Sequence, residues 1–242
     1  MTPLTEELPS ARAAALPSAT IASLWKNLKF VSDPSGLTND QVNSILPILE
    51  EEAQAREVRQ IRYLLQRSGI KRIKRFEDFD WKFNPKLPRE KLMAFAHSAW
   101  SENIQNLVLI GPSGVGKSHL ASALCYQAIQ QKIQTAFIPC FDLVAKLKRA
   151  RNKHTLIQYY STVKVFCLDE LGYVFPSQEE ANDIFQIISK RSELATTIVT
   201  TNLIPSQWGK IFDAATATAI LDRLNLKGTF LTLEGDSYRG RK

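Results

Sequence analysis

The chain has 242 residues, of which 44% are hydrophobic and 23% are charged, a composition typical of one large globular domain or one domain with a smaller appendage. No stretch is long and apolar enough to cross a bilayer, and no basic segment precedes the Ala-rich patch near the N-terminus, so a membrane span and a signal peptide are both disfavoured. The net charge of +7 favours an anionic partner. Three cysteines without metal-ligand spacing predict buried, reduced thiols and a cytoplasmic protein: Cys125, Cys140 and Cys167.

The first part of the chain predicts helices. Residues 1–36 are rich in Pro, Ala, Ser and Thr, and we expect a mobile arm with a short helix around residues 21–30. A longer helix is expected over residues 38–68, with Thr38 capping its first turn and Pro47 breaking or kinking it.

A connector rich in charged and aromatic side chains is expected over residues 70–90. Much of the basic excess lies at the end of the preceding predicted helix and the start of this connector, because residues 56–75 hold eight basic side chains and one acidic one, a net charge of 8 − 1 = +7. A second basic run, residues 146–153, holds five basic side chains and no acidic one. We predict three parts. These are an arm (residues 1–36), a helical N-terminal domain that includes the basic connector (residues 37–87), and a core (residues 88–242).

From about residue 88, helices alternate with short β-rich runs. The strands are expected at Asn106–Ile110, Thr135–Pro139, Val163–Leu168, Thr196–Thr200 and Thr229–Leu233. Helices are expected over residues 89–101 and 141–160. Another follows the first strand and runs through Gln131, one starts at a capping box formed by Ser177 and Glu180, and the last helices end near Leu226. Such alternation implies a parallel sheet covered on both faces, so the predicted fold class is α/β.

One octapeptide matches the pattern G-x-x-x-x-G-K-[ST] in full, between an apolar strand and a helical run. Its residues are Gly111, Pro112, Ser113, Gly114, Val115, Gly116, Lys117 and Ser118. The glycines let the backbone curl so that N–H groups point at phosphate oxygens, and the start of the helix adds its positive dipole end. Lys117 is expected to reach the β- and γ-phosphates and Ser118 to bind Mg²⁺, with His119 as a further nucleotide contact. This context predicts a P-loop that binds ATP with Mg²⁺.

Polar side chains follow two later strands. Asp169 and Glu170 end a buried run, and successive strand residues point in different directions, so the two carboxylates can have separate roles. We expect Asp169 to hold Mg²⁺ through water, and Glu170 to orient and deprotonate the attacking water. Asn202 is either a contact of the γ-phosphate or the attacking water, or a simple turn residue, and its position alone leaves both readings open. Arg223 on an amphipathic helix is by itself typical of a solvated side chain.

Taken together, these segments resemble the IstB-like helper ATPases of insertion-sequence transposition, relatives of the DnaC-like helicase loaders in the AAA+ superfamily. The resemblance runs from about Arg62 to Arg239, and includes the P-loop, Leu-Gly-Tyr after the acidic pair and the closing Gly-Asp-Ser-Tyr-Arg. It implies an AAA+ core with a five-stranded parallel sheet, and ATP held between neighbouring subunits of a ring or spiral. It also implies that Asn202 senses the γ-phosphate, that Arg223 is an arginine finger for the neighbour's ATP, and that Arg239 is a candidate second sensor.

The same resemblance implies duplex DNA and a transposase as partners. The two basic runs would then bind the DNA backbone with little regard to sequence, through Arg72, Lys74, Arg75, Lys146, Lys148, Arg149, Arg151 and Lys153. The alternative explanation for both runs is a solvated helix face. Two other functions stay open: a loader that places a helicase on single-stranded DNA with the same motor, and a small-molecule kinase, which the basic runs and the acidic pair disfavour.

Overall fold

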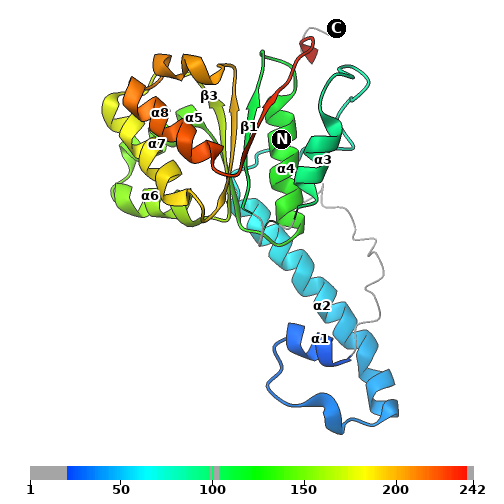
Figure 1. The fold of residues 1–242 in the computed structure, drawn as a ribbon. Helices are drawn as coiled ribbons and strands as arrows, with labels where there is room; N and C mark the ends of the chain where they lie inside the picture. The colour runs from blue at the N-terminus through cyan, green and yellow to red at the C-terminus, as the bar shows by residue number, and fades with distance from the viewer. Residues whose placement is uncertain (1–20, 99, 101–103, 239–242) are drawn as a thin grey trace. The chain divides into compact units, whose positions relative to one another are not determined.

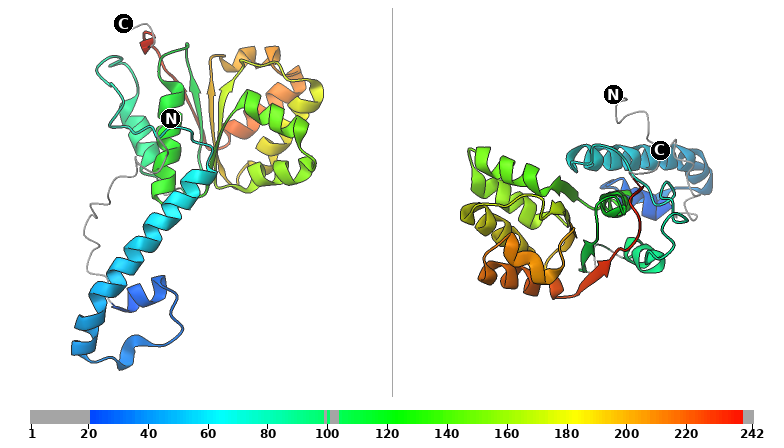
Figure 2. Two further views of the ribbon diagram at one scale, coloured as in Figure 1. Left: turned by 180° about the vertical axis from the view of Figure 1, so that it is seen from behind. Right: turned by 90° about the horizontal axis from the view of Figure 1, so that it is seen from above.

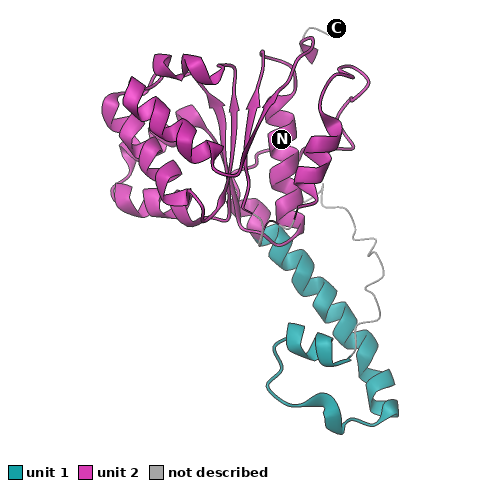
Figure 3. Cartoon of the chain, in the orientation of Figure 1, with its two compact units in different colours: residues 1–63 teal, residues 64–242 magenta. Residues whose placement is uncertain are grey.

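The computed structural model describes residues 21–98, 100 and 104–238. The chain forms two compact units, residues 1–63 and residues 64–242 (Figure 3), and helix α2 (Asn39–Arg67) continues across the division. The boundaries at residues 36 and 87 that composition suggests stay predictions. Within the described residues, no helix is both long enough and apolar enough to cross a membrane.

The first unit holds helix α1 (Ile21–Asn27), the 3₁₀ turn η1 (Pro34–Gly36) and the first part of α2. Leu24 and Leu28 pack against Leu49, so the apolar face of α1 is buried on α2. Helix α2 continues through Pro47 instead of ending there. Residues on both sides of Pro47 pack in this cluster, and their burial offsets the hydrogen bond that a proline cannot donate.

The second unit is built on a five-stranded parallel sheet, as predicted. The strands are β1 (Asn106–Ile110), β2 (Thr135–Pro139), β3 (Val165–Leu171), β4 (Thr196–Thr201) and β5 (Gly228–Thr232). Their order is β2-β3-β4-β1-β5, and every neighbouring pair is parallel, so all the strands end at the same edge of the sheet. The segments that follow the strands therefore gather at that edge.

Helices cover both faces of this sheet (Figures 1 and 2). One face carries α4 (Lys117–Gln130), with α3 (Arg89–Ala96) beside it. The other carries α5 (Cys140–Arg149), α6 (Lys153–Thr162), α7 (Gln178–Arg191) and α8 (Ala214–Asn225), with the 3₁₀ turn η2 (Pro205–Lys210) before α8. The predicted capping box begins α7, where Ser177 and Glu180 bond each other's backbone N–H groups. With helices on both sides, β1 and β4 are buried along their whole length.

The core of the second unit includes a fully buried cation. The Arg191 guanidinium donates to the carbonyl oxygens of Tyr160 and Val163, both at 2.7 Å, and of Thr196 at 2.6 Å. Its Nε donates to Thr197 Oγ1 at 3.1 Å. Burial lowers the pKa of Arg191 to about 9. This side chain fastens the end of α6 to the start of β4. The three cysteines are also buried and are not joined in disulfides, as predicted.

Candidate functional site

A cavity of about 580 Å³ opens at the edge where the strands end. Its walls come from five parts of the second unit: the P-loop and the start of α4, strand β2, the end of β3 with the turn after it, the connector before α3, and the C-terminal tail. Its volume is typical of a pocket for a small organic ligand.

The P-loop forms the floor of this cavity. Gly114 and Gly116 have φ angles of +85° and +101°, which other residues rarely adopt. Lys117 is only 7% exposed, and its Nζ donates to the carbonyl oxygens of Gly111 and Pro112, both at 2.8 Å. Because α4 begins at Lys117, the N–H groups of its first turn and the positive end of its dipole lie at the cavity. This arrangement suits a polyphosphate.

The side chains of Ser118 and Asp169, both of which carry oxygen atoms that can bind a metal, meet beside the floor of the cavity. Asp169 is 5% exposed, and its Oδ1 accepts a hydrogen bond from Ser118 Oγ at 2.9 Å. Mg²⁺ prefers oxygen ligands, and it usually binds through one or two protein groups together with phosphate oxygens. The two residues predicted to hold the metal are therefore in contact in the structure, and their chemistry fits Mg²⁺.

Glu170 lies at the same cavity, in an unusual backbone conformation. Its φ angle is +59°, in the left-handed region that glycine favours. Strand β3 runs past the acidic pair to Leu171, whereas the sequence placed its end at Leu168. Its register against β4 shifts between Leu168 and Leu171, so the pair sits in a β-bulge. Adjacent residues of a regular strand point to opposite faces, and the bulge lets both carboxylates line one cavity.

The structure does not bring the other two predicted catalytic residues into this cavity. Asn202 follows β4 and is exposed, and its Oδ1 lies near Gly172, in the turn after β3. Arg223 lies on α8, with its guanidinium 6.0 Å from the centre of the Phe185 ring. Neither is among the described residues that line the cavity. Arg239 lies outside the described residues.

The connector forms a wall that the sequence did not predict. The Phe79 ring packs so closely on Gly116 that a Cβ there would overlap it. The same ring meets His119 edge-on, with 5.1 Å between ring centres. His119 Nε2 lies 3.0 Å from the carbonyl oxygen of Arg75, and burial lowers the pKa of His119. A neutral His119 therefore carries its proton on Nε2, because a carbonyl oxygen can only accept.

The C-terminal tail, residues 234–238, lies across the P-loop. The backbone N–H of Tyr238 donates to the carbonyl oxygen of Gly114 at 3.1 Å. Asn84 and Asp236 exchange two hydrogen bonds, from Asn84 Nδ2 to the Asp236 carbonyl at 3.2 Å and from the Asp236 N–H to Asn84 Oδ1 at 3.1 Å. Segments 152 residues apart are thus joined over the loop.

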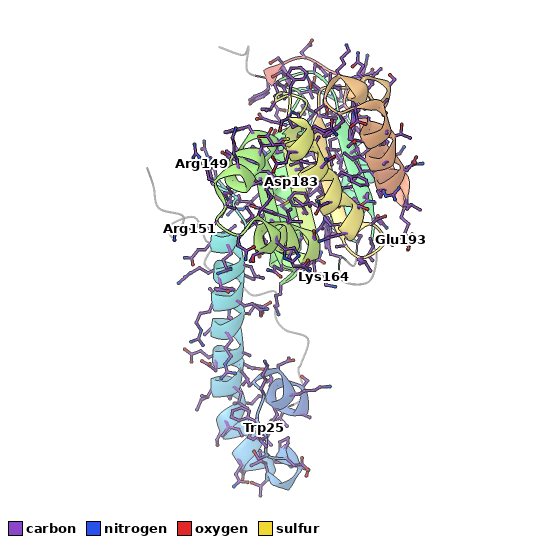
Figure 4. The ribbon with its side chains drawn as sticks, turned by 90° about the vertical axis from the view of Figure 1, so that its left-hand side faces the viewer. Trp25, Arg149, Arg151, Lys164, Asp183 and Glu193 are labelled. Carbon is purple, nitrogen blue, oxygen red and sulfur yellow. The ribbon has the colours of Figure 1, made fainter. Side chains whose placement is uncertain are left out.

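Four of the predicted DNA contacts form an exposed cluster, the α5 cluster, at the end of α5 and in the loop after it: Lys146, Lys148, Arg149 and Arg151. The side chains of Arg149 and Arg151 point away from the sheet (Figure 4). Lys153 differs, because its Nζ lies 2.5 Å from Glu179 and 2.9 Å from Asp183. These carboxylates, first Glu179 and then Asp183, raise the pKa of Lys153.

The connector's three predicted DNA contacts lie elsewhere in the second unit. Arg72 and Lys74 are on the wall of the cavity. The Arg75 guanidinium lies 5.8 Å from the centre of the Tyr126 ring. Position alone therefore allows Arg72 and Lys74 to contact a nucleotide as readily as DNA.

Comparisons with solved structures give the fold. DnaI superposes with a TM-score of 0.58 at 21% identity, over 68% of this chain and 89% of that chain. The DnaC helicase loader superposes with a TM-score of 0.52 at 25% identity, over 60% and 87%. The fold is the AAA+ P-loop core that the sequence predicted.

Sequence comparisons give the family. The model of the IstB-like ATP binding protein family matches residues 11–242. A protein from Bacillus thuringiensis subsp. berliner, named as an ATP-binding protein of insertion sequence IS232, is 34% identical over 202 residues, which cover 82% of this chain and 81% of the relative. Another, named for insertion sequence IS21 of Pseudomonas aeruginosa, is 37% identical over 195 residues, or 79% and 74%. The chain therefore belongs to the family of IstB-like ATP binding proteins.

Proposed function

We propose that this protein is a cytoplasmic, Mg²⁺-dependent ATPase that assembles on duplex DNA with ATP bound and helps to recruit or activate a transposase. The observation that carries the proposal is the hydrogen bond between Ser118 and Asp169, which joins the phosphate-binding loop to the acidic pair within one cavity. The insertion-sequence names of its relatives support the biological setting.

In the proposed reaction, the loop amides and Lys117 bind the β- and γ-phosphates. Ser118 and Asp169 hold Mg²⁺, which when bound neutralises charge on the phosphates. Glu170 orients a water molecule and takes its proton as the water attacks the γ-phosphate, while the bond from the γ-phosphorus to the bridging oxygen breaks and ADP leaves with that oxygen. The aromatic side chains of the connector and the tail supply an apolar wall for the nucleoside.

The position of Arg223 supports a site completed by a second subunit. Its side chain is partly exposed on α8 and is outside the cavity lining, so it is available to a neighbouring molecule. An arginine supplied to a neighbour's phosphates raises turnover by about 10³- to 10⁵-fold. We expect Arg223→Ala to bind ATP without hydrolysing it. Mixing it with Lys117→Ala should restore part of the activity, and no recovery in a co-assembled mixture would refute the role.

DNA binding is proposed for the α5 cluster, because four cationic side chains are exposed together there and repeat in every subunit of an assembly. Each phosphate neutralised adds about 0.9 to the slope of log affinity against log salt. The double variant Lys148→Ala/Arg149→Ala should therefore bind duplex DNA more weakly and with a shallower salt slope. The matched control Lys164→Ala/Lys210→Ala removes two other exposed charges and should bind like the wild type. Equal losses in both variants would point to net charge alone.

A helicase loader is the second candidate, because the DnaC helicase loader shares the fold at 25% identity. The motor would be the same, with single-stranded DNA and a helicase as partners. Tighter binding of single strands than of duplex, with a stable complex with a replicative helicase, would favour this candidate.

Electron microscopy of the Glu170→Gln variant tests the main proposal. This variant should bind ATP and hydrolyse it very slowly, so assemblies on duplex DNA should accumulate with ATP and be absent without it. Lys117→Ala is the control and should form none. A protein that binds no adenine nucleotide with Mg²⁺, with or without DNA, would refute the proposal.

A further inference from the structure

The bulge in β3 places two residues opposite one residue of β4. Leu168 pairs with Val199, and the next pair joins Leu171 to Thr201. Between these pairs, β3 contributes Asp169 and Glu170, and β4 contributes Thr200 alone. Bulges of this kind leave backbone groups without their regular ladder partners.

The Thr200 hydroxyl fills this gap. The side chain is fully buried, and its Oγ1 donates to Asp169 Oδ1 at 2.5 Å. The same oxygen accepts a hydrogen bond from the backbone N–H of Glu170 at 2.9 Å. These directions follow from chemistry, because a carboxylate only accepts and an amide N–H only donates. One hydroxyl therefore contacts both members of the acidic pair.

Each contact fixes a different feature. The bond to Asp169 sets the carboxylate oxygen that also accepts from Ser118 Oγ. The bond to the Glu170 amide secures a residue whose φ angle of +59° costs an ordinary L-residue energy. Such a conformation persists only where its surroundings hold it.

We propose that Thr200 is a positioning residue of the ATPase site, whose hydroxyl orients Asp169 for the metal and holds the bulge that aims Glu170 into the cavity. The inference rests on the proposed ATPase function. Thr200 is not among the described residues that line the cavity, so it acts through the two carboxylates and not on the nucleotide.

The test compares variants that separate the hydroxyl from the shape of the side chain. Thr200→Val keeps the shape and removes the hydroxyl, and Thr200→Ser keeps the hydroxyl. The control is Thr197→Val, on the same strand, where the residue is 2% exposed and its hydroxyl accepts from Arg191. For each protein we would measure kcat, the Mg²⁺ concentration for half-maximal rate, and the affinity for ADP in EDTA.

Groups that orient a metal ligand typically change metal affinity or activity by about 10- to 100-fold. We expect Thr200→Val to lower kcat and raise the Mg²⁺ requirement by such factors, with unchanged ADP affinity in EDTA. Thr200→Ser should recover most of the activity. Thr197→Val should unfold more easily than the wild type and keep its kcat and Mg²⁺ requirement. If Thr200→Val does not fold, Thr200→Cys gives the same comparison, because a thiol is only a weak donor.

Wild-type kcat and Mg²⁺ requirement in Thr200→Val would overturn the inference and leave the ATPase intact. Equal losses in Thr200→Val and Thr197→Val, or a serine variant no better than valine, would also overturn it, since they indicate a structural role only. A wild-type protein without Mg²⁺-dependent hydrolysis would instead refute the proposed function, and the inference with it.

Discussion

Glycine at position 170 should make the protein more stable than alanine does, which is the reverse of the usual order. Glu170→Gly and Glu170→Ala both remove the carboxylate, so the contacts of that side chain cancel in the comparison. The left-handed conformation at φ = +59° costs a residue with a Cβ about 1–2 kcal/mol, and glycine avoids this cost. Glycine loses about 0.4–1 kcal/mol through the greater freedom of its unfolded chain. The midpoints of these two ranges, about 1.5 and about 0.7 kcal/mol, leave glycine ahead by about 0.8 kcal/mol.

Thermal and urea unfolding without nucleotide would measure this difference. For a chain of this size, it corresponds to a rise in Tm of about 1–4 °C for glycine over alanine. The same comparison at Lys132 provides a positive control, because its φ angle is +63°. The opposite control compares Thr229→Gly with Thr229→Ala, at an exposed position on β5. Because φ is not positive there, the alanine variant should be the more stable protein. Alanine equal to or better than glycine at position 170, with both controls behaving as stated, would refute the bulge conformation on which the site depends.

Three further predictions concern the cavity. Lys117→Ala should abolish binding of ATP with Mg²⁺ in calorimetry while the unfolding transition persists. Gly114→Ala should weaken nucleotide binding, because the φ angle of Gly114 is +85° and a Cβ would overlap Ser237 of the tail. An unchanged nucleotide affinity would contradict this prediction. Burial lowers the pKa of His119 in the folded state below its unfolded value of about 6.5, so between these values only the unfolded chain takes up the proton. Stability should therefore fall as pH drops below about 6.5, and His119→Gln should reduce that fall in urea titrations at pH 7 and pH 5.5.

Local patterns were enough to predict the sheet and the phosphate loop. Strand β1 has the predicted bounds, and α4 begins at Lys117 as the motif requires. Each of these features depends on residues close together in the chain: an apolar run, glycines at fixed spacing and a helix start. A sequence encodes such features directly, and the structure reproduces them.

The bulge at Asp169 and Glu170 could not be predicted in the same way. A left-handed glutamate has no propensity signal, because the conformation is imposed by pairing with β4 and by the Thr200 hydroxyl. The sequence therefore ended the strand at Leu168. The hydrogen bonds between Asn84 and Asp236 could not be predicted for a related reason, because the two residues are far apart in the chain and meet only in the folded structure.

Features encoded locally in the sequence and contacts between distant segments build different parts of the cavity. The phosphate end is built from a contiguous loop and neighbouring strand ends, so it offers the same backbone amides and carboxylate to any nucleoside triphosphate. The remaining walls include the connector and the tail, which are joined by contacts such as that of Asn84 with Asp236. Side chains that touch the nucleoside set which base is accepted and how tightly, because the phosphates are common to all. Changes at the phosphate end should therefore remove activity, whereas changes in the connector or the tail should alter the preference among nucleotides.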